Sequence, residues 1–529
     1  MIIPDVALEL SIEQLIGALN KKLFTEYTRV QSKLPPVSRN LVATLTIEID
    51  ALEKRAKDVL HEVITLRNSL RPVNRLPLEV IALCAAFVSR NDPRPIIPLT
   101  HVCRYWRKAI VFSPRNWASI GSGWKRLVSL CLERAAAAPL TISISISDIK
   151  GDGDFLQALL PHTSRISNLS LTGYSSIEGV TDDLPGFFAS PIPNLTSVEL
   201  EQTEKPTEWF PSNEAPAPPL FRNVSKLRSL HLVRTPLHPT VFSITSLVEL
   251  KLVGYADPFH FGKFIEFLHS NPGLEVVILD LQFIEDSVWI APERKTSLPQ
   301  LRHLTFTCGS ATDARGLLSC VSLRRGSHIT IQGPQSDPRT DFASFLPCPP
   351  TSIRELLDPV TVIKLWSSPG LFHIFGGGGR LAFQGSKNTY DGFKLFVTGA
   401  VREFHTDVYR LDPSGDHLSW PLRRLPALEA LVLSKTRFPP GSLSVLAEEP
   451  VLCPSLKTIA FFDCKVNEDV IRELEEVLAK RRDSTAARLY RVVIVNNTRA
   501  LPDLQLIHQL RKFVPRVDVG VGDELPDLL

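Results

Sequence analysis

The sequence predicts a chain of the α+β class in which N-terminal helices precede a curved solenoid of α/β repeats. Three observations support this prediction. An apolar heptad pattern runs through residues 45–70, short helical patterns follow within residues 73–120, and a short strand pattern recurs between residues 166 and 494. We therefore expect three parts in the chain of 529 residues: a helical region at 1–72, a three-helix module at 73–120 and the solenoid at 121–529.

The first part carries one clear helical periodicity. Apolar residues are separated by alternating intervals of four and three, at Leu45, Ile49, Leu52, Ala56, Val59, Val63, Leu66 and Leu70. Charged residues occupy the other faces, as in a solvated coiled-coil helix. Such a seam must be buried on a partner helix, on a second copy of the chain through residues 45–70, or on the helices of residues 73–120. Residues 6–30 also have helical spacing, as a second helix or as a poorly ordered tail.

The spacing of apolar residues within 73–120 predicts short helices with wide apolar faces. Leu76 and Pro77 stand where a helix would begin, because proline is tolerated in the first turn. Apolar residues then recur at helical intervals on either side of a proline-rich break, at Val80, Ile81, Leu83, Cys84 and Phe87 and at Leu99, Val102, Cys103, Trp106 and Ile110. So small a segment cannot bury all of these residues alone, and we expect a partner or a neighbouring domain to cover some of them.

These residues resemble the F-box, a docking module. The resemblance rests on Leu76-Pro77-Leu78-Glu79-Val80-Ile81, on the run from Val102 to Ile110 and on Ser113-Pro114-Arg115-Asn116-Trp117, a version similar to those of mushroom-forming fungi. It implies three helices that dock on the Skp-type adaptor of cullin-RING ubiquitin ligases. The residues that match the adaptor-binding positions are Leu76, Pro77, Val80, Ile81, Val102, Cys103 and Trp106.

The long C-terminal part repeats one local pattern. With Val, Ile or Phe allowed for Leu, the pattern L-x-x-L-x-L fits residues 166–171, 195–200, 227–232, 247–252, 274–279, 301–306, 428–433, 456–461 and 489–494. Several steps between neighbouring runs are 20, 27 or 28 residues, which is the spacing of leucine-rich repeats. Each unit is then a short strand whose leucines face a shared core, followed by a turn and a convex segment.

The pattern fades between about residues 309 and 407, where we expect divergent repeats. Strands are predicted around 329–331, 360–365 and 393–396. The run Gly376–Gly379 lacks the following Lys-Ser or Lys-Thr of a phosphate-binding loop, so it is interpreted as a turn that enters a strand.

The side chains between the buried leucines are expected on the concave face of the solenoid. They are polar and mixed in sign, and the predicted target-binding residues are Glu199, Glu201, His231, Glu249, Lys251, Asp280 and His303. A surface tuned to phosphate alone would carry more arginine. The alternative is that these are only solvated strand residues.

Composition and motifs argue against several other functions. The 59 basic and 56 acidic residues nearly balance, which disfavours a nucleic-acid or membrane partner. The 8 cysteines are scattered without a C-x-x-C pair, as expected of reduced thiols in the cytoplasm or nucleus. We expect no secretory signal, no membrane span and no metal or cofactor. We also expect no enzymatic activity, because catalytic motifs are missing.

The sequence therefore predicts a substrate-recognition subunit of a cullin-RING (SCF-type) ubiquitin ligase. The F-box-like helices would dock on the adaptor, and the repeat surface would hold an unknown protein target. The alternative is a leucine-rich-repeat scaffold or interaction protein without a role in ubiquitin transfer. Adaptor binding separates the two.

Overall fold

The structure is a computed structural model, and it divides the chain into two compact units, residues 1–117 and 118–529. Beside single residues, and parts of 17–32, the residues that it describes are 36–89, 94–149, 154–174, 190–202, 224–235, 239–255, 261–281, 295–333, 342–347, 356–366, 371–376, 378–384, 399–407, 421–434, 443–447, 452–464, 466–483, 488–496 and 504–521.

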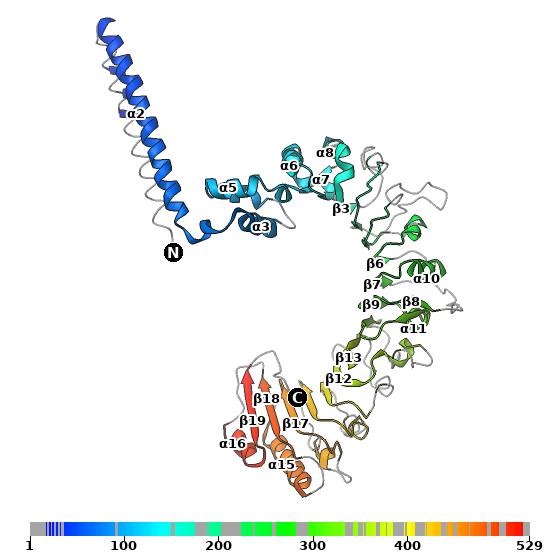
Figure 1. Cartoon of the computed structure of the whole chain (residues 1–529). Coiled ribbons are helices and arrows are strands. Elements are labelled where there is room, and N and C mark those ends of the chain that lie inside the picture. Colours follow the sequence, from blue (N-terminus) through cyan, green and yellow to red (C-terminus); the bar gives the residue numbers. More distant parts are fainter. Residues whose placement is uncertain are drawn as a thin grey trace. The chain divides into compact units, whose positions relative to one another are not determined.

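The first unit contains a long helix, α2 (Pro36–Ser69), which a 3-10 turn, η1 (Pro72–Arg75), follows (Figure 1). The predicted heptad seam lies on α2. Its side chains are exposed, for example Leu52 at 61% and Val63 at 57%. Among the described residues, nothing buries this seam, although a seam of this kind normally pairs with another helix. The predicted helical segment at 6–30 falls mostly outside the described residues.

Three helices and a 3-10 turn complete the first unit: α3 (Leu78–Val88), α4 (Ile96–Thr100), α5 (Arg104–Val111) and η2 (Pro114–Trp117). Helix α5 packs against both α3 and α4. Their shared core is small, and its buried apolar residues are Ile81, Ala82, Ala85, Ile96, Ala109, Ile110 and Trp117. The Trp117 indole N–H donates to the Ile110 carbonyl at 3.0 Å, which fixes η2 against the end of α5.

The second unit is built on one long sheet of 17 strands among the described residues. The strands are β1 (Ser119–Gly121), β2 (Leu140–Ser145), β3 (Ile166–Tyr174), β4 (Ser197–Gln202), β5 (Ser229–Val233), β6 (Glu249–Tyr255), β7 (Val276–Leu281), β9 (His303–Cys308), β11 (His328–Gln332), β12 (Val360–Trp366), β13 (Leu371–Gly376), β14 (Gly379–Gln384), β15 (Glu403–Asp407), β16 (Ala430–Ser434), β17 (Thr458–Phe462), β18 (Arg491–Asn496) and β19 (Arg516–Val521). Strand β1 lies within the segment that we predicted as the three-helix module, so residues 118–120 belong to the second unit.

Successive strands pair in parallel from β1 to β7, and then through β9 to β11. Parallel pairing resumes from β12 through β15 to β19. Each of the nine predicted leucine patterns contains the start of a strand, and in eight of them the strand begins at the third residue. The predicted repeat solenoid is therefore confirmed by the strand register.

Helices and 3-10 turns join the strands and, in Figure 1, follow the outer side of the strand arc of this unit. They are η3 (Ser122–Leu127), α6 (Val128–Ala135), α7 (Ile146–Ile149), α8 (Asp154–Leu159), η4 (Leu160–Arg165), η6 (Pro239–Ser243), α10 (Phe261–Ser270), α11 (Ala311–Cys320), η7 (Phe342–Phe345), η8 (Ser444–Ala447), α15 (Glu468–Asp483) and α16 (Leu504–Phe513). A small parallel pair, β8 (Thr296–Leu298) with β10 (Val321–Leu323), lies apart from the long sheet. The leucines of the strands and the apolar sides of these helices form the core.

The divergent segment departs from the repeat by an antiparallel insertion. Strand β14 pairs with β11 in parallel, but β13 lies antiparallel between β14 and β12. Strands β13 and β14 meet at the glycine run, with Gly376 opposite Gly379. A Cβ atom on Gly376 would lie 2.0 Å from the Leu357 carbonyl oxygen, so only glycine fits there. The turn interpretation is confirmed, as are the strands near 329–331 and 360–365, whereas 393–395 lie outside the described residues.

A buried amide connects neighbouring repeats near the middle of the sheet. The Asn271 side chain is fully buried; its Nδ2 donates to the carbonyls of Ile244 at 2.7 Å and Phe267 at 2.9 Å, and its Oδ1 accepts from the Leu247 N–H at 3.0 Å. These bonds join the end of α10 to the turn that precedes β6. Backbone groups that the sheet cannot satisfy thereby find partners.

Candidate functional site

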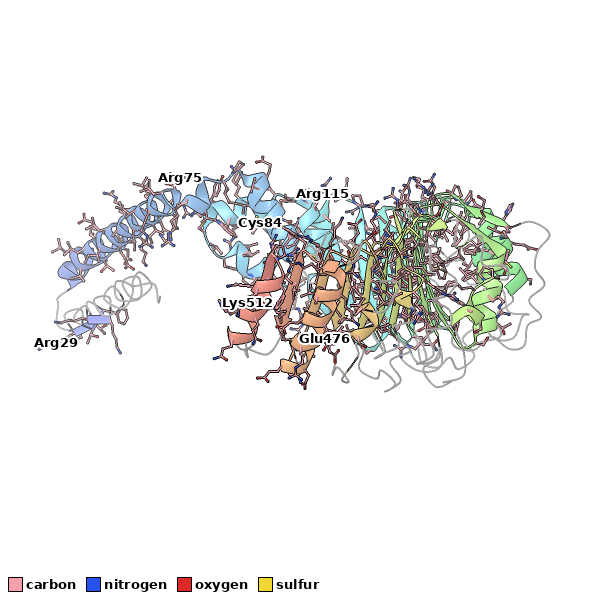
Figure 2. The ribbon with its side chains drawn as sticks, turned by 90° about the horizontal axis from the view of Figure 1, so that it is seen from below. Arg29, Arg75, Cys84, Arg115, Glu476 and Lys512 are labelled. Atoms are coloured by element: carbon pink, nitrogen blue, oxygen red, sulfur yellow. The ribbon has the colours of Figure 1, made fainter. Side chains whose placement is uncertain are left out.

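An apolar stripe on α3 is the first candidate binding surface. Val80, Leu83, Cys84 and Phe87 recur at intervals of three and four, and we call these four residues the α3 stripe. Leu83 is 69% exposed and Phe87 is 78% exposed; Cys84 is exposed as well (Figure 2). The other side of the helix, at Ile81, is buried at 1%. A helix that is apolar on all sides is normally buried on all sides, so the stripe indicates a partner surface.

The predicted adaptor-binding residues fall into three groups. Exposed residues are Leu76, Pro77, Val80 and Val102; Cys103 and Trp106 are half-buried; and Ile81 is buried. Ile81 therefore belongs to the core of the helices. The predicted set omits Leu83 and Phe87, although the helical spacing contains both and they are the most exposed apolar side chains of α3.

Two hydrogen bonds hold the segment before α3 against α5. The Trp106 indole N–H donates to Asn74 Oδ1 at 2.7 Å, and the Tyr105 hydroxyl donates to the Leu76 carbonyl at 2.7 Å. Trp106 thus positions the turn from which Leu76 and Pro77 extend. Its replacement would disturb the fold of the helices as well as any surface that they present.

The concave side of the second unit is the other candidate surface. Buried and partly exposed residues alternate along β4, β5 and β9, as in a half-buried sheet. The predicted target-binding residues all occupy the partly exposed or exposed positions of their strands: Glu199, Glu201, His231, Glu249, Lys251, Asp280 and His303. The structure brings them together on one face, in adjacent strands from β4 to β9.

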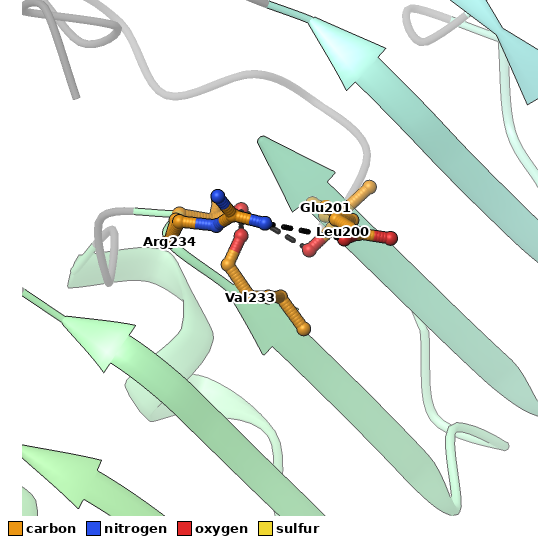
Figure 3. A network of polar contacts seen from close by, with 5 residues as sticks. Leu200, Glu201, Val233 and Arg234 are labelled. Carbon is orange, nitrogen blue, oxygen red and sulfur yellow. Dashed lines mark hydrogen bonds and ion pairs between the residues drawn. The ribbon is translucent and has the colours of Figure 1, made fainter. Parts of the chain in front are cut away.

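The glutamates of this face already have partners within the sheet. Glu199 accepts a hydrogen bond from the Ser170 hydroxyl at 3.1 Å. Glu249 accepts one from Ser229 at 3.1 Å and lies 3.0 Å from His231 Nε2. Arg234 follows β5 and its guanidinium lies 3.4 Å from Glu201, beside the strand ends at Leu200 and Val233 (Figure 3). The carboxylates of this face thus already have hydrogen-bond or ion-pair partners within the sheet.

Asp280 on β7 lies between Val253 of β6 and Thr307 of β9. Burial raises the pKa of its carboxyl group, and its Oδ1 has no hydrogen-bond partner in the described part of the chain. Val253 lies opposite it on β6, and Val276 and Ile278 precede it on the same face of β7. The apolar residues of this part of the concave face are thus confined to β7 and the end of β6.

Beyond β7, the concave face carries basic and imidazole side chains that we call the basic cluster: His303, His328, Arg380, His373 and Lys364. In the strand register, His303 lies opposite His328, which lies opposite Arg380 on its other side. His373 lies opposite Lys364. The rings of His303 and His328 are 5.1 Å apart, and the Lys364 ammonium lies 5.5 Å from the centre of the Phe375 ring.

Two histidines of the basic cluster are held neutral by their surroundings. Burial and the charges of Arg380 and Lys364 lower the pKa of His373 to about 4. Burial, His303 and Arg380 also lower the pKa of His328. Both rings are therefore neutral at neutral pH.

A buried hydrogen-bonded pair, Glu403 with His405, and an apolar cluster border this region. His405 contacts Glu403 on β15; burial raises the Glu403 pKa, but the His405 hydrogen bond and the His405 and Lys364 charges lower it overall. Burial lowers the pKa of His405. The next concave positions are small, apolar and buried, at Ala430, Val432, Ala460, Val493 and Val495.

Four of the five residues of the basic cluster were not predicted from the sequence. All four lie on strands of the divergent segment, where leucine anchors are irregular. The sequence could have indicated these residues only through the alternation of polar and apolar residues that predicts a half-buried strand, as in His328-Ile329-Thr330-Ile331-Gln332.

Within the described ranges, no group of three or more His, Cys, Asp or Glu residues could hold a metal ion. Among the cysteines described, all seven are free thiols, and Cys131, Cys308, Cys320, Cys453 and Cys464 are buried. Burial raises the pKa of Cys308 and of Cys453 to about 12, so these thiols are unreactive at neutral pH. The described helices include none with both the length and the apolar character to cross a bilayer.

Comparisons with known proteins add few constraints. No protein-family model matches the chain, and no curated protein matches it. Two solved structures are similar over most of the chain. A leucine-rich-repeat protein of Leptospira interrogans has 12% identity, covers 72% of this chain and 89% of its own, and has a TM-score of 0.28. Toll-like receptor 13, in a complex with ssRNA13, has 12% identity, covers 73% of this chain and 53% of its own, and has the same TM-score.

The class of the second unit rests on its own register. Parallel strands, buried leucines at fixed positions and repeat spacing together define a leucine-rich-repeat-like solenoid. Solenoids of this kind present an extended concave surface for binding. The first unit adds a separate set of helices with an exposed apolar stripe.

Proposed function

We propose that this protein is the substrate-recognition subunit of a cullin-RING ubiquitin ligase. The helices from η1 to η2 would dock on the Skp-type adaptor, and the concave face of the solenoid would hold a protein target. Its contribution is proximity, because a bound target is brought to the ubiquitin-loaded enzyme. No catalytic residue is assigned to this chain.

The observation that carries the proposal is the α3 stripe. Leu83 and Phe87 are large, apolar and mostly exposed on a helix whose opposite side forms a core. Large apolar side chains at such a site are the usual anchors of a protein interface. Their position, directly after the Leu76-Pro77 signature, agrees with the F-box resemblance.

The proposal is tested by capture from a fungal lysate, with the full chain as bait. Adaptor and cullin, identified by mass spectrometry, should be retained by the parent protein and lost with the double variant Leu83→Glu, Phe87→Glu. A matched control is Tyr490→Glu, an exposed aromatic residue (57%) in the second unit, which should retain both. Unchanged retention by the double variant would contradict adaptor docking through α3.

The second candidate function is an interaction scaffold without a role in ubiquitin transfer. The exposed seam of α2 favours it, because this surface would bind another helix independently of any adaptor. Absence of adaptor and cullin from the material retained by a folded parent protein would favour this candidate.

A further inference from the structure

The basic cluster on the concave face is the feature that the sequence analysis did not foresee. It joins residues 303 to 380, which are separated in the sequence and are brought together by the antiparallel insertion. Neighbouring strands lie about 4.8 Å apart, so β9, β11, β14, β13 and β12 present their side chains as one contiguous surface. The two fixed cations of this surface, Arg380 on β14 and Lys364 on β12, lie on either side of β13.

In the part of the chain that the structure describes, neither fixed charge of this surface, Arg380 or Lys364, forms an ion pair at contact distance. Arg380 Nε is buried and has no hydrogen-bond partner among the described residues. Lys364 lies over the Phe375 ring, and no ion pair of its ammonium group is found in the ranges that the structure describes. Glu403 is the acidic residue near Lys364, and it is already bonded to His405. The glutamates of β4 to β6, by contrast, are all partnered.

We propose that the basic cluster binds the carboxylates of an acidic segment of a protein. Arg380 and Lys364 supply the positive charge, while His328 and His373 supply neutral N–H donors. Two fixed cations suit one or two carboxylates, whereas phosphate groups are typically held by several arginines. This assignment names the kind of target and rests on the proposed use of the concave face as the target surface.

Two apolar residues of β7 near the basic cluster determine the residue spacing that a bound segment should have. Val276 and Ile278 on β7 are partly exposed, and β7 lies three strand positions from β14. That separation is roughly 14 Å, which an extended peptide spans in about four residues. The fitting segment therefore has apolar residues about four positions away from its Asp or Glu residues.

Below neutral pH, binding of the segment favours protonation of the histidines in the basic cluster. The groups around His373 are Arg380 on β14, Lys364 on β12 and the Glu403–His405 pair on β15; His328 faces His303 on β9 and Arg380. A carboxylate placed between these groups offsets the positive charges and stabilises the imidazolium forms. At neutral pH both imidazoles act as neutral donors, and binding should tighten only as the pH falls below about 6, where His373 with its pKa of about 4 begins to take up a proton.

The test measures fluorescence anisotropy with the full chain and no adaptor. The probe is a labelled dodecapeptide with two valines and, about four residues further on, two glutamates. The parent protein should bind it, and the double variant Arg380→Gln, Lys364→Gln should bind about tenfold or more weakly, because charge-assisted hydrogen bonds are lost. The charge-matched control Arg472→Gln, Lys457→Gln, which alters exposed residues outside the cluster, should stay within about twofold of the parent.

Three further probes decide the class of ligand. A peptide with glutamines for the glutamates should bind at least about tenfold more weakly than the acidic probe. Equal binding of the two would overturn the proposal. So would preferential binding of a phosphoserine peptide or of a single-stranded RNA of the same length. Because the adaptor is absent, failure here leaves adaptor docking untouched, and failure of adaptor docking leaves this binding measurable.

Discussion

Replacing Asn271 should loosen the solenoid locally at the repeat that contains β6. The variant Asn271→Ala removes three hydrogen bonds and leaves the Leu247 N–H and the carbonyls of Ile244 and Phe267 without partners in a fully buried place. At about 1 kcal/mol for each lost bond, and more for groups left unsatisfied, the cost is about 3 kcal/mol.

Because the repeats of a solenoid are stabilised mainly by contacts with their neighbours, the effect is best measured at a single amide near the substitution. Amide hydrogen exchange at Leu247 should accelerate roughly a hundredfold, since about 1.4 kcal/mol corresponds to a factor of ten. The control is Ser270→Ala, which removes a hydroxyl that bonds only to its own helix at Glu266 and should change exchange little. Exchange at Leu247 in Asn271→Ala within a few-fold of the parent would refute the reasoning.

Three other predictions follow from the same structure. The variant Leu52→Glu, Val59→Glu should abolish self-association in analytical ultracentrifugation if the exposed α2 seam pairs two chains; an unchanged sedimentation coefficient would exclude this pairing. Gly376→Ala should cost about 3 kcal/mol or prevent folding, because its Cβ would overlap the backbone between α11 and β12; melting by circular dichroism should show it, and an unshifted melting temperature would be incompatible with the turn. The stability of the second unit should fall as the pH drops from 6.5 toward about 4, because unfolded His373 binds a proton that the folded chain rejects. Screening at this partly exposed ring limits the loss to at most about 2 kcal/mol, and His373→Asn should flatten this part of a pH-dependent denaturation series.

The repeat region was predictable where leucine anchors are regular. In runs such as Leu227 to Leu232 the sequence contains both the spacing and the alternation, because the same residues build each core layer. It was less predictable where the anchors change. The strand β2 has isoleucines and serines in place of the leucine pattern, and β13 runs against its neighbours, an arrangement that repeat spacing cannot express.

The candidate surfaces were predictable to different degrees. Helical spacing located the apolar residues of α3 but not the side that is exposed, since this depends on how α5 packs against Ile81. The acidic part of the concave face was found because it follows the leucine pattern. The basic cluster was missed because it depends on contacts between Arg380, His373 and Lys364 that only strand order creates.

The central claim is that the helices of the first unit bind a ligase adaptor directly. The most direct measurement is the affinity of the purified adaptor for the purified full chain, by isothermal titration calorimetry, for the parent and for Leu83→Glu, Phe87→Glu. Burying these two largely exposed side chains is worth about 3 kcal/mol together, so the variant should bind roughly a hundredfold more weakly with an unchanged melting temperature. Equal affinities of the two proteins, or no binding by a folded parent, would contradict the account.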